Sequence, residues 1–503
     1  MSAERSREDS LGSRVTTAAA WMVAFRWVDR LVGLVSVAIL ARLLAPDDFG
    51  VVGYALLVSG ILELFTGLST DAELIRRAHA TRAHYDAAWT MNALRGLAIS
   101  MLMLALALPA ADFFREARLG PIMGILAAIP LVQGFENVGI VDFRKRLEFH
   151  REFRFLLTTR LIGTAVTIAL AFALRTYWAL VAGAIVRAAF RVALSYRVHP
   201  FRPRFELSRV AEMFRFSRWM MIQNLASGLN ERMPGFVIGR EWDSSALAFF
   251  NLGRELAELS STEIRAPIRR ALYPGLAQIV ERRARLAEVL VRSSGVLALV
   301  TLPIPLGMAL VADDVVPLVL GPQWLPTIAL LQPLCIAGAI SALGTNSQLA
   351  YMVLDRSHLA AIAVSVRMLL LLGLLLVISP RFGVVGVAYA IASVTCLMTI
   401  VDYAIAPRLL GIERRRFLAV VWRPIVAALA MAAGVWILRF VLPPPSDVTG
   451  HAWSLFLTVV LGAIVYLTCL LALWRLGGRR DGPEQWVIRL VKERYARHLR
   501  SAA

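Results

Sequence analysis

Charged side chains are scarce in this sequence of 503 residues. They make up 18% of the chain, whereas hydrophobic residues make up 58%. Soluble domains are about 25% charged and about 45–50% apolar, so the composition excludes an ordinary soluble protein. Lysine is nearly absent, because Lys145 and Lys492 are the only two, and arginine therefore carries almost all of the positive charge.

Cysteine is scarce too, and its placement excludes a metal or redox motif. Cys335, Cys396 and Cys469 are far apart, and each lies in an apolar run. This spacing predicts three small core residues. We expect no metal site and no cofactor, with H⁺ or Na⁺ left open as a coupling ion.

Long apolar runs fill most of the chain instead. A helix that crosses a bilayer needs about 20 mostly apolar residues. By this criterion the sequence predicts an all-α integral membrane protein with about fourteen transmembrane helices. The predicted segments are 17–42, 48–69, 88–111, 120–141, 155–174, 177–196, 217–239, 246–268, 290–312, 326–353, 358–379, 382–405, 418–440 and 452–474.

The distribution of arginine between these segments predicts their orientation. Loops on alternate sides are rich and poor in arginine, and positively charged loops stay in the cytoplasm. Both termini are then cytoplasmic, and the net charge of +19 reflects membrane topology rather than a nucleic-acid partner. The arginines assigned to the opposite side are Arg115, Arg118, Arg175, Arg240, Arg381 and Arg439.

An internal repeat predicts two lobes. The segment "ARLLAPDDFGVVGYA" (Ala41 to Ala55) aligns with "GREWDSSALAFFNLG" (Gly239 to Gly253), and both form the turn after the first helix of a six-helix unit. The two units begin on the same side, as in transporters with parallel repeats. The predicted parts are an N-lobe at 15–199, a C-lobe at 200–410, an appended helix pair at 411–475 and a cytoplasmic basic amphipathic tail at 476–503.

Several charged residues fall inside the predicted spans, where an unpaired charge costs about 3 kcal/mol or more. Arg26, Asp29 and Arg30 share one face of the first helix, because their spacings are three and four. Arg187 and Arg367 lie near the middle of two other helices. The second lobe adds Glu231, Arg254, Glu255 and Glu258, and Arg254 and Glu258 are spaced to pair.

Two interpretations of these charges stay open. Structural ion pairs should balance, but the first and sixth helices carry more arginine than acid, which favours a polar cavity between the lobes. Because the guanidinium fork binds phosphate oxygens bidentately, such a cavity suits an amphipathic anion with a phosphate-bearing headgroup. Arg95, Arg160 and Arg191 lie near helix ends, and we expect them to extend to the headgroup layer. The acids that could carry H⁺ or bind Na⁺ are Glu63, Glu136, Glu231, Glu255 and Glu258.

Four motifs resemble the polysaccharide transporter branch of the MOP flippase superfamily, which includes the Wzx-like oligosaccharide flippases. They are "AILARLLAPDDFGVVGYALL" (Ala38 to Leu57), "YWALVAG" (Tyr177 to Gly183), "LGPQWLPTIALLQPLCIAG" (Leu320 to Gly338) and "FGVVGVAYAIA" (Phe382 to Ala392). The resemblance implies a flippase of the bacterial inner membrane that moves polyprenyl-diphosphate-linked oligosaccharide, an O-antigen or exopolysaccharide repeat unit, by alternating access.

The resemblance also implies roles for particular residues and partners. Arg26, Arg30 and Arg254 bind the diphosphate, with Arg187 and Arg367 as further candidates. Asp29 orients the arginines of the first helix. The implied partners are the lipid-linked oligosaccharide, inner-membrane lipids, and a polysaccharide polymerase with its assembly proteins, and the chain itself is expected to be a monomer.

Two alternatives differ in the chemistry they need. An ion-coupled drug or cation antiporter of the same superfamily favours an acidic, aromatic cavity, whereas this sequence has excess arginine. A membrane glycosyltransferase or polymerase needs a large loop with an acidic catalytic motif. The acidic pairs Asp47-Asp48 and Asp313-Asp314 lie in short connections and are expected to have turn roles. We therefore do not expect an enzyme.

Overall fold

The computed structural model describes residues 2–66, 70–77, 79–441, 445 and 447–477. These residues are almost entirely helical, and none of them lies in a β-strand, which confirms the predicted all-α fold class. They form two compact units, Met1–Ala248 and Phe249–Ala503. Nearly all of the predicted amphipathic tail, 476–503, lies outside the described residues.

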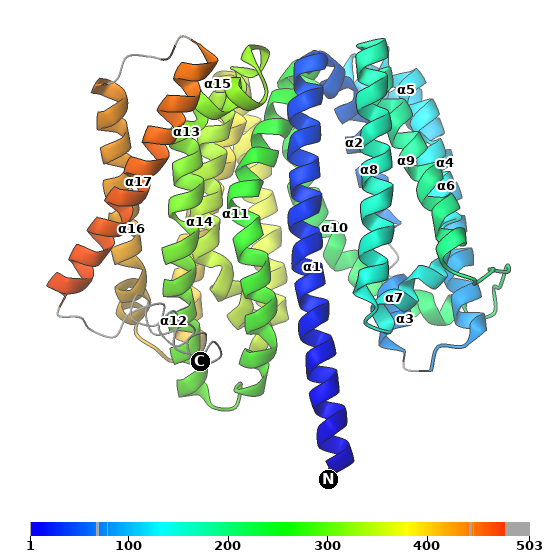
Figure 1. Ribbon diagram of the computed structural model, residues 1–503, viewed down its shortest axis with the longest axis horizontal. Helices are drawn as coiled ribbons and strands as arrows, with labels where there is room; N and C mark the ends of the chain where they lie inside the picture. Colours follow the sequence, from blue (N-terminus) through cyan, green and yellow to red (C-terminus); the bar gives the residue numbers. More distant parts are fainter. Residues whose placement is uncertain (1, 67–69, 78, 442–444, 446, 478–503) are drawn as a thin grey trace, which may run out of the picture. The chain divides into compact units, whose positions relative to one another are not determined.

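The first unit begins with a long helix that packs along α8 (Figure 1). Its further close pairs are α8 with α9, α4 with α6, and α2 with α10. Its elements are α1 (Ser2–Leu43), α2 (Pro46–Phe65), α3 (Thr70–Arg76), α4 (Arg82–Phe114), α5 (Leu119–Leu126), α6 (Ala128–Gly134), η1 (Val138–Ile140), α7 (Val141–Lys145), α8 (Phe149–Leu174), α9 (Trp178–Val198) and α10 (Val210–Glu241).

The second unit begins within α11, whose first turn still belongs to the first unit. Helices α14 and α15 pack together, and the last pair, α16 and α17, packs against α12 and α13. The elements are α11 (Ser244–Gln278), α12 (Arg283–Thr301), α13 (Pro303–Val319), η2 (Pro322–Trp324), α14 (Thr327–Val353), α15 (Ser357–Leu410), α16 (Arg414–Val441) and α17 (Val448–Leu476).

Within the described residues, the predicted transmembrane segments fall on helices or on bent helices, and residues 67–69 at the end of the second segment lie outside the described residues. Nine helices of the described part are long and apolar enough to cross a membrane, and a bent pair, Leu119–Gly134 with Val138–Lys145, raises the number to ten. The charged helices α1, α10 and α11 are not among the nine. Helix α15 counts once, yet its 54 residues would extend about 80 Å at 1.5 Å per residue, far beyond a bilayer. Gly383, with φ 66° and ψ −161°, breaks it into two helices, so fourteen crossings stay a prediction consistent with the fold.

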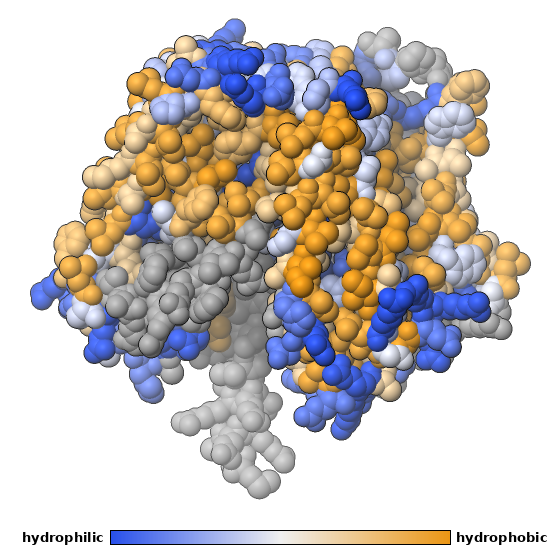
Figure 2. All heavy atoms as spheres, turned by 180° about the vertical axis from the view of Figure 1, so that it is seen from behind, coloured by the Kyte–Doolittle hydropathy of each residue, from blue (hydrophilic) through white to orange (hydrophobic). Residues whose placement is uncertain are grey.

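Hydrophobic side chains cover the outer faces of the helices, where exposure to water would raise the free energy of the folded protein. Figure 2 shows apolar residues along the helices and hydrophilic residues gathered near helix ends. On α16, Trp436 is 68% and Phe440 85% exposed, and on α4, Leu108 is 74% exposed. Such apolar surface is stable against lipid tails, so the chain is a multi-pass membrane protein.

The connections at one end of the first unit are fixed by two aspartates of the repeated motif. Asp47 accepts two hydrogen bonds from Arg118, at 2.6 and 3.0 Å, and a third from Ser244. Asp48 accepts from the backbone N–H of Tyr177 at 2.9 Å. Both carboxylates therefore tie loops together, as the predicted turn roles require.

The other acidic pair fastens the last two helices to α13. Asp314 is 2% exposed and accepts from Arg439 at 2.7 Å and from Ser454 at 3.0 Å. His451 lies 3.1 Å from the other oxygen of the same carboxylate. Asp313 also pairs with Arg439. The pair thus joins α13, α16 and α17, which is a structural role.

The segment between α9 and α10 is fastened to the first unit. The backbone N–H of Arg204 donates to Asp86 at 2.8 Å, and that of Glu206 donates to Thr90 at 3.0 Å. The ring of Phe205 packs on Trp89 at a centroid distance of 5.0 Å. The boundary between the two compact units, after Ala248, therefore lies beyond the expected lobe boundary at 199/200. That lobe boundary stays a prediction.

Helices α4 and α6 approach each other at two glycines. A Cβ at Gly96 would lie 2.3 Å from the carbonyl oxygen of Pro130 and 3.1 Å from the Cα of Gly134. Small residues allow such backbone contact between membrane helices. This contact places the end of α6 against α4, where the polar residues described below meet.

We expect Gly96→Ala to lower the free energy of unfolding by about 1–3 kcal/mol, because the added methyl group forces α4 and α6 apart. Gly124→Ala on α5 is the matched control, since a Cβ there meets nothing within 4 Å. The control should be neutral or slightly stabilising, as alanine favours helix more than glycine does. Thermal unfolding of both variants in detergent measures the difference, and equal melting temperatures would contradict the packing argument.

Candidate functional site

The charged face of α1 is paired with α8. Asp29 Oδ1 lies 3.5 Å from Nε of Arg160, and all three predicted residues of this face, Arg26, Asp29 and Arg30, are half-buried. The Arg160 guanidinium passes close to Gly33, where a Cβ would lie 3.0 Å from its Nη2. The carboxylate therefore forms an ion pair with an arginine of a neighbouring helix that the sequence alone did not assign to it.

Helix α9 brings a further arginine to this group. The side-chain carbons of Arg187 pack on Gly163 of α8, where a Cβ would lie 2.7–2.8 Å from them. Its guanidinium lies within electrostatic range of Arg160, Arg191 and Asp29. We call the residues Arg26, Asp29, Arg30, Arg160 and Arg187 the arginine cluster of the first unit. The cluster, as defined, contains four arginines and one acid, Asp29.

The other acids of the first unit are spread over different elements. Glu63 lies in the last turn of α2, and Glu231 lies exposed on α10. Glu136 lies in the short segment between α6 and η1. Asp29 pairs with Arg160 of the arginine cluster, and the ion-coupling roles of Glu63, Glu136 and Glu231 stay predictions.

The second unit contains the predicted helical pair. Arg254 Nε donates to Glu258 Oε1 at 2.8 Å on α11, which confirms the pairing expected from their spacing. Both side chains are half-buried, and Glu255 is exposed beside them. Their proposed contact with substrate stays a prediction.

Arg367 lies in a polar group that the sequence reading missed. It is within electrostatic range of Asp402, a carboxylate that is 4% exposed and accepts a hydrogen bond from Tyr351 at 3.0 Å. A lone aspartate inside the apolar run of a predicted span is a signal of a buried polar contact. That signal was present in the sequence at Asp402.

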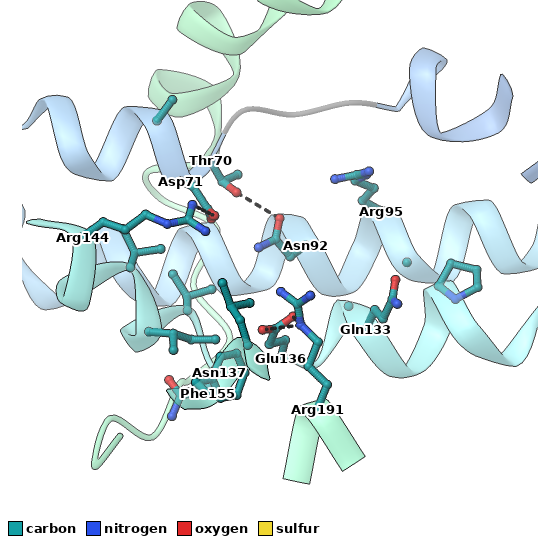
Figure 3. Close-up of a pocket in the computed structure, with 18 of the residues that line it drawn as sticks. Thr70, Asp71, Asn92, Arg95, Gln133, Glu136, Asn137, Arg144, Phe155 and Arg191 are labelled. Carbon is teal, nitrogen blue, oxygen red and sulfur yellow. Dashed lines mark hydrogen bonds and ion pairs between the residues drawn. The ribbon is translucent and has the colours of Figure 1, made fainter. Parts of the chain in front are cut away.

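A cavity of about 530 Å³ lies within the first unit. Its walls come from the end of α2, from α3, α4 and α6, from η1 and α7, and from α8 and α9. Figure 3 shows its polar side chains. The charged lining residues are Glu63, Asp71, Arg95, Glu136, Arg144, Glu152 and Arg191.

One wall of the cavity is a broken membrane segment. The bent pair that α5 and α6 form with η1 and α7 turns by 62°, and residues 135–137 at the break are not helical. Non-helical backbone at membrane depth is tolerated where it lies inside protein or lines a polar cavity. Broken helices of this kind form binding sites in transporters.

Asn137 satisfies the hydrogen bonds of this break. Its backbone N–H donates to Ser195 at 3.0 Å, and its side-chain amide donates to the carbonyl of Phe201 at 2.8 Å. The same amide donates to the carbonyl of His199. Burial lowers the pKa of the His199 imidazole, so this ring is neutral at pH 7. The break is thus held by the segment that follows α9.

Glu136 and Arg191 form a bidentate pair at the cavity wall. Nε of Arg191 donates to both carboxylate oxygens, at 2.9 and 3.0 Å, and its guanidinium also stacks on Phe155 at 5.8 Å. Arg144 pairs in turn with Asp71 and Glu152. Three of the four lining acids therefore have an arginine partner.

Arg95 lines the same cavity but differs from Arg144 and Arg191 in its hydrogen bonding. Its Nε–H is buried and has no hydrogen-bond acceptor in the described part of the chain. Glu63 and Asp71 lie within electrostatic range of its guanidinium. Asn92, one turn earlier on α4, accepts a hydrogen bond from Thr70 at 3.1 Å and also faces the cavity.

The described structure directs Arg160 to Asp29, Arg191 to Glu136, and Arg95 into the cavity. The expectation that these three arginines extend to the headgroup layer stays a prediction. No group of three or more metal-ligating side chains occurs among the residues that the structure describes.

Two helical units, arginines inside membrane helices and a broken segment around a polar cavity define an integral membrane transporter. The model of the family described as "Polysaccharide biosynthesis protein" matches residues 39–329, more than half of the chain. The chain belongs to this family, which confirms the family resemblance of its motifs.

Two curated relatives are similar over most of their length. The lipopolysaccharide biosynthesis protein WzxC of Escherichia coli K12 is 23% identical over 86% of this chain and 89% of its own. The teichuronic acid biosynthesis protein TuaB of Bacillus subtilis is 22% identical over 91% and 95%. The succinoglycan biosynthesis transport protein ExoT of Rhizobium meliloti is 24% identical over 62% and 63%.

Solved structures agree with the fold. The lipid II flippase MurJ in an inward closed conformation has a TM-score of 0.72 at 13% identity and covers 90% of this chain and 98% of its own. An inward-facing multidrug transporter of the MATE family and the MOP superfamily has a TM-score of 0.60 at 15% identity, with coverage of 78% and 95%. At these identities the likeness shows that the chain shares the fold of these transporters.

We expect Arg191→Gln to lower the free energy of unfolding by about 1–3 kcal/mol, because it leaves the Glu136 carboxylate without its partner. The double variant Glu136→Gln/Arg191→Gln should recover part of this loss, since two amides carry no unpaired charge. Thermal unfolding of the single and double variants in detergent forms the test. A double variant less stable than Arg191→Gln would show that the pair does not act as described.

Proposed function

We propose that this protein is a flippase that moves polyprenyl-diphosphate-linked oligosaccharide across the bacterial inner membrane by alternating access. The observation that carries the proposal is the arginine cluster, in which one aspartate accompanies four arginines inside membrane helices. Several arginines on adjoining helices favour an anionic ligand, and the guanidinium fork is suited to phosphate oxygens.

The relatives support a glycan as the remainder of the substrate. Their names assign them to lipopolysaccharide biosynthesis, teichuronic acid biosynthesis and succinoglycan transport. A lipid-linked intermediate combines the three chemistries that this protein would meet: an apolar tail for the bilayer, a diphosphate for the arginines, and a sugar chain for polar walls. Polysaccharide assembly supplies such an intermediate, and the protein would transport it without chemical change.

Particular side chains receive roles in this proposal. Arg26 and Arg30 of the first unit and Arg254 of the second bind the diphosphate, and Arg187 and Arg367 are further candidates. Asp29 orients the cluster through Arg160. The acids proposed for H⁺ or Na⁺ coupling are Glu63, Glu136, Glu231, Glu255 and Glu258.

A drug or cation antiporter of the same superfamily is the second candidate. The MATE structure shows that this fold serves such transporters. A cationic substrate would be repelled by the arginine cluster, however, so the charge balance of the first unit favours an anionic substrate. The remaining partners we propose are inner-membrane lipids and a polysaccharide polymerase with its assembly proteins, and the transporting form is a monomer.

We expect Arg30→Ala and Arg254→Ala each to reduce transport at least tenfold, because each removes a bidentate donor to the diphosphate. Arg381→Ala is the matched control, since this exposed arginine lies at the break in α15 and has no role in the proposal. The measurement uses proteoliposomes with polyprenyl-diphosphate-linked oligosaccharide and an external lectin that detects translocated glycan. Wild-type rates for both variants, with unchanged gel-filtration profiles, would refute the assignment.

The proposed orientation is tested separately. With both termini in the cytoplasm, alkaline phosphatase fused after Ala503 should be inactive, because the enzyme folds only in the periplasm. A fusion within the connection after α16, for example at Pro445, should be active. The reverse pattern of activities would invert the topology and every loop assignment that rests on it.

A further inference from the structure

The cavity of the first unit is separate in composition from the arginine cluster, and the proposed transport of a diphosphate gives it no role. The cluster consists of four arginines and one aspartate, whereas the cavity wall mixes arginines, carboxylates and amides. Arg187 and Arg191 connect the two, because they stand one turn apart on α9, about 6 Å along the helix axis. Arg187 belongs to the cluster, and Arg191 belongs to the cavity wall.

Among the arginines of the cavity wall, Arg95 differs from Arg144 and Arg191 in how its charge is paired. Arg191 is bound by Glu136, and Arg144 is bound by Asp71 and Glu152. The Nε–H of Arg95 is buried without an acceptor among the described residues. Glu63 lies within electrostatic range but is exposed at the end of α2.

A guanidinium with a buried, unsatisfied N–H loses free energy that an oxyanion in the cavity would restore. The planar fork of arginine binds a carboxylate through two parallel hydrogen bonds. The ligand that satisfies Arg95 therefore carries an oxyanion, and this oxyanion must fit beside the other side chains of the wall.

The remainder of the wall suits a sugar ring rather than a free phosphate. Asn92 and Gln133 present amide groups (Figure 3). Cavities of about 300–1,000 Å³ hold small organic ligands, and a phosphate ion would fill only a small part of 530 Å³. The nearby carboxylates also disfavour a doubly charged phosphate more than a singly charged carboxylate.

We propose that this cavity is a subsite for a sugar that bears a carboxylate, and that Arg95 binds the carboxylate group. The subsite rests on the proposed function, because the sugar belongs to the glycan of the lipid-linked substrate. Asn92 and Gln133 bind ring hydroxyls. Glu63, which lies within electrostatic range of Arg95, competes with the carboxylate of the sugar for this guanidinium.

The binding experiment uses purified full-length protein in detergent and three probes: methyl β-D-glucuronoside, methyl β-D-glucoside and inorganic phosphate. We expect the wild-type protein to bind the glucuronoside at least tenfold more tightly than the glucoside. Arg95→Gln should lose this preference while its affinity for the glucoside stays unchanged. Glu63→Gln should bind the glucuronoside several-fold more tightly, because the competing carboxylate is gone. Arg381→Gln is the matched control and should behave as wild type.

Three results would overturn the subsite. The first is equal affinity of the wild-type protein for glucuronoside and glucoside. The second is a preference for the glucuronoside that persists in Arg95→Gln. The third is phosphate binding as tight as glucuronoside binding and equally lost in Arg95→Gln, which would assign the cavity to phosphate. Because Arg95→Gln and Glu63→Gln should change affinity in opposite directions, loss of folding cannot imitate the expected result.

Transport in proteoliposomes distinguishes failure of the subsite from failure of the proposed function. With a uronic-acid-containing lipid-linked oligosaccharide and its neutral counterpart, Arg95→Gln should slow only the acidic substrate, by at least fivefold. Equal slowing of both substrates, or of neither, would overturn the subsite while leaving the flippase proposal intact. If the wild-type protein moves neither substrate, the flippase proposal fails, and the binding experiment alone decides the cavity.

Discussion

The cost of holding arginine inside a membrane constrains this structure more than any other interaction. Hydrocarbon offers no water to a guanidinium, so each buried arginine needs an acid, a carbonyl or a ligand. Arg160 finds Asp29 on another helix, and Arg191 finds Glu136 in a non-helical break. The arginine cluster contains one aspartate and four arginines, and this composition favours an anionic ligand, as the proposed binding of a diphosphate requires.

The break after α6 is the second consequence of the same constraint. A carboxylate at membrane depth and its neighbouring non-helical backbone both need partners. Asn137 supplies several of them by reaching Ser195 and the carbonyls that follow α9. The connection after α9 is thereby bound to the first unit through the same residue that completes the cavity wall. A change in that connection would alter the geometry around Glu136.

Structural features that depend on local sequence pattern could be predicted from the sequence. Apolar runs gave the helices, and the spacing of four gave the pair of Arg254 with Glu258, because both signals lie within one helix. The pair of Arg191 with Glu136 was out of reach, since it joins positions 55 residues apart on separate elements. Asp402 was missed although a lone aspartate in an apolar span was a visible signal.

The two polar regions of the first unit make different demands on a ligand, and this difference argues for one extended substrate. A region with one acid for four arginines stabilises a multiply charged group such as a diphosphate. A wall in which most charges already pair stabilises hydroxyls and at most one further negative charge. The helical turn between Arg187 and Arg191 separates these demands by about 6 Å, a distance comparable to one sugar ring. A diphosphate joined directly to a glycan meets both demands, whereas a compact drug cation meets neither.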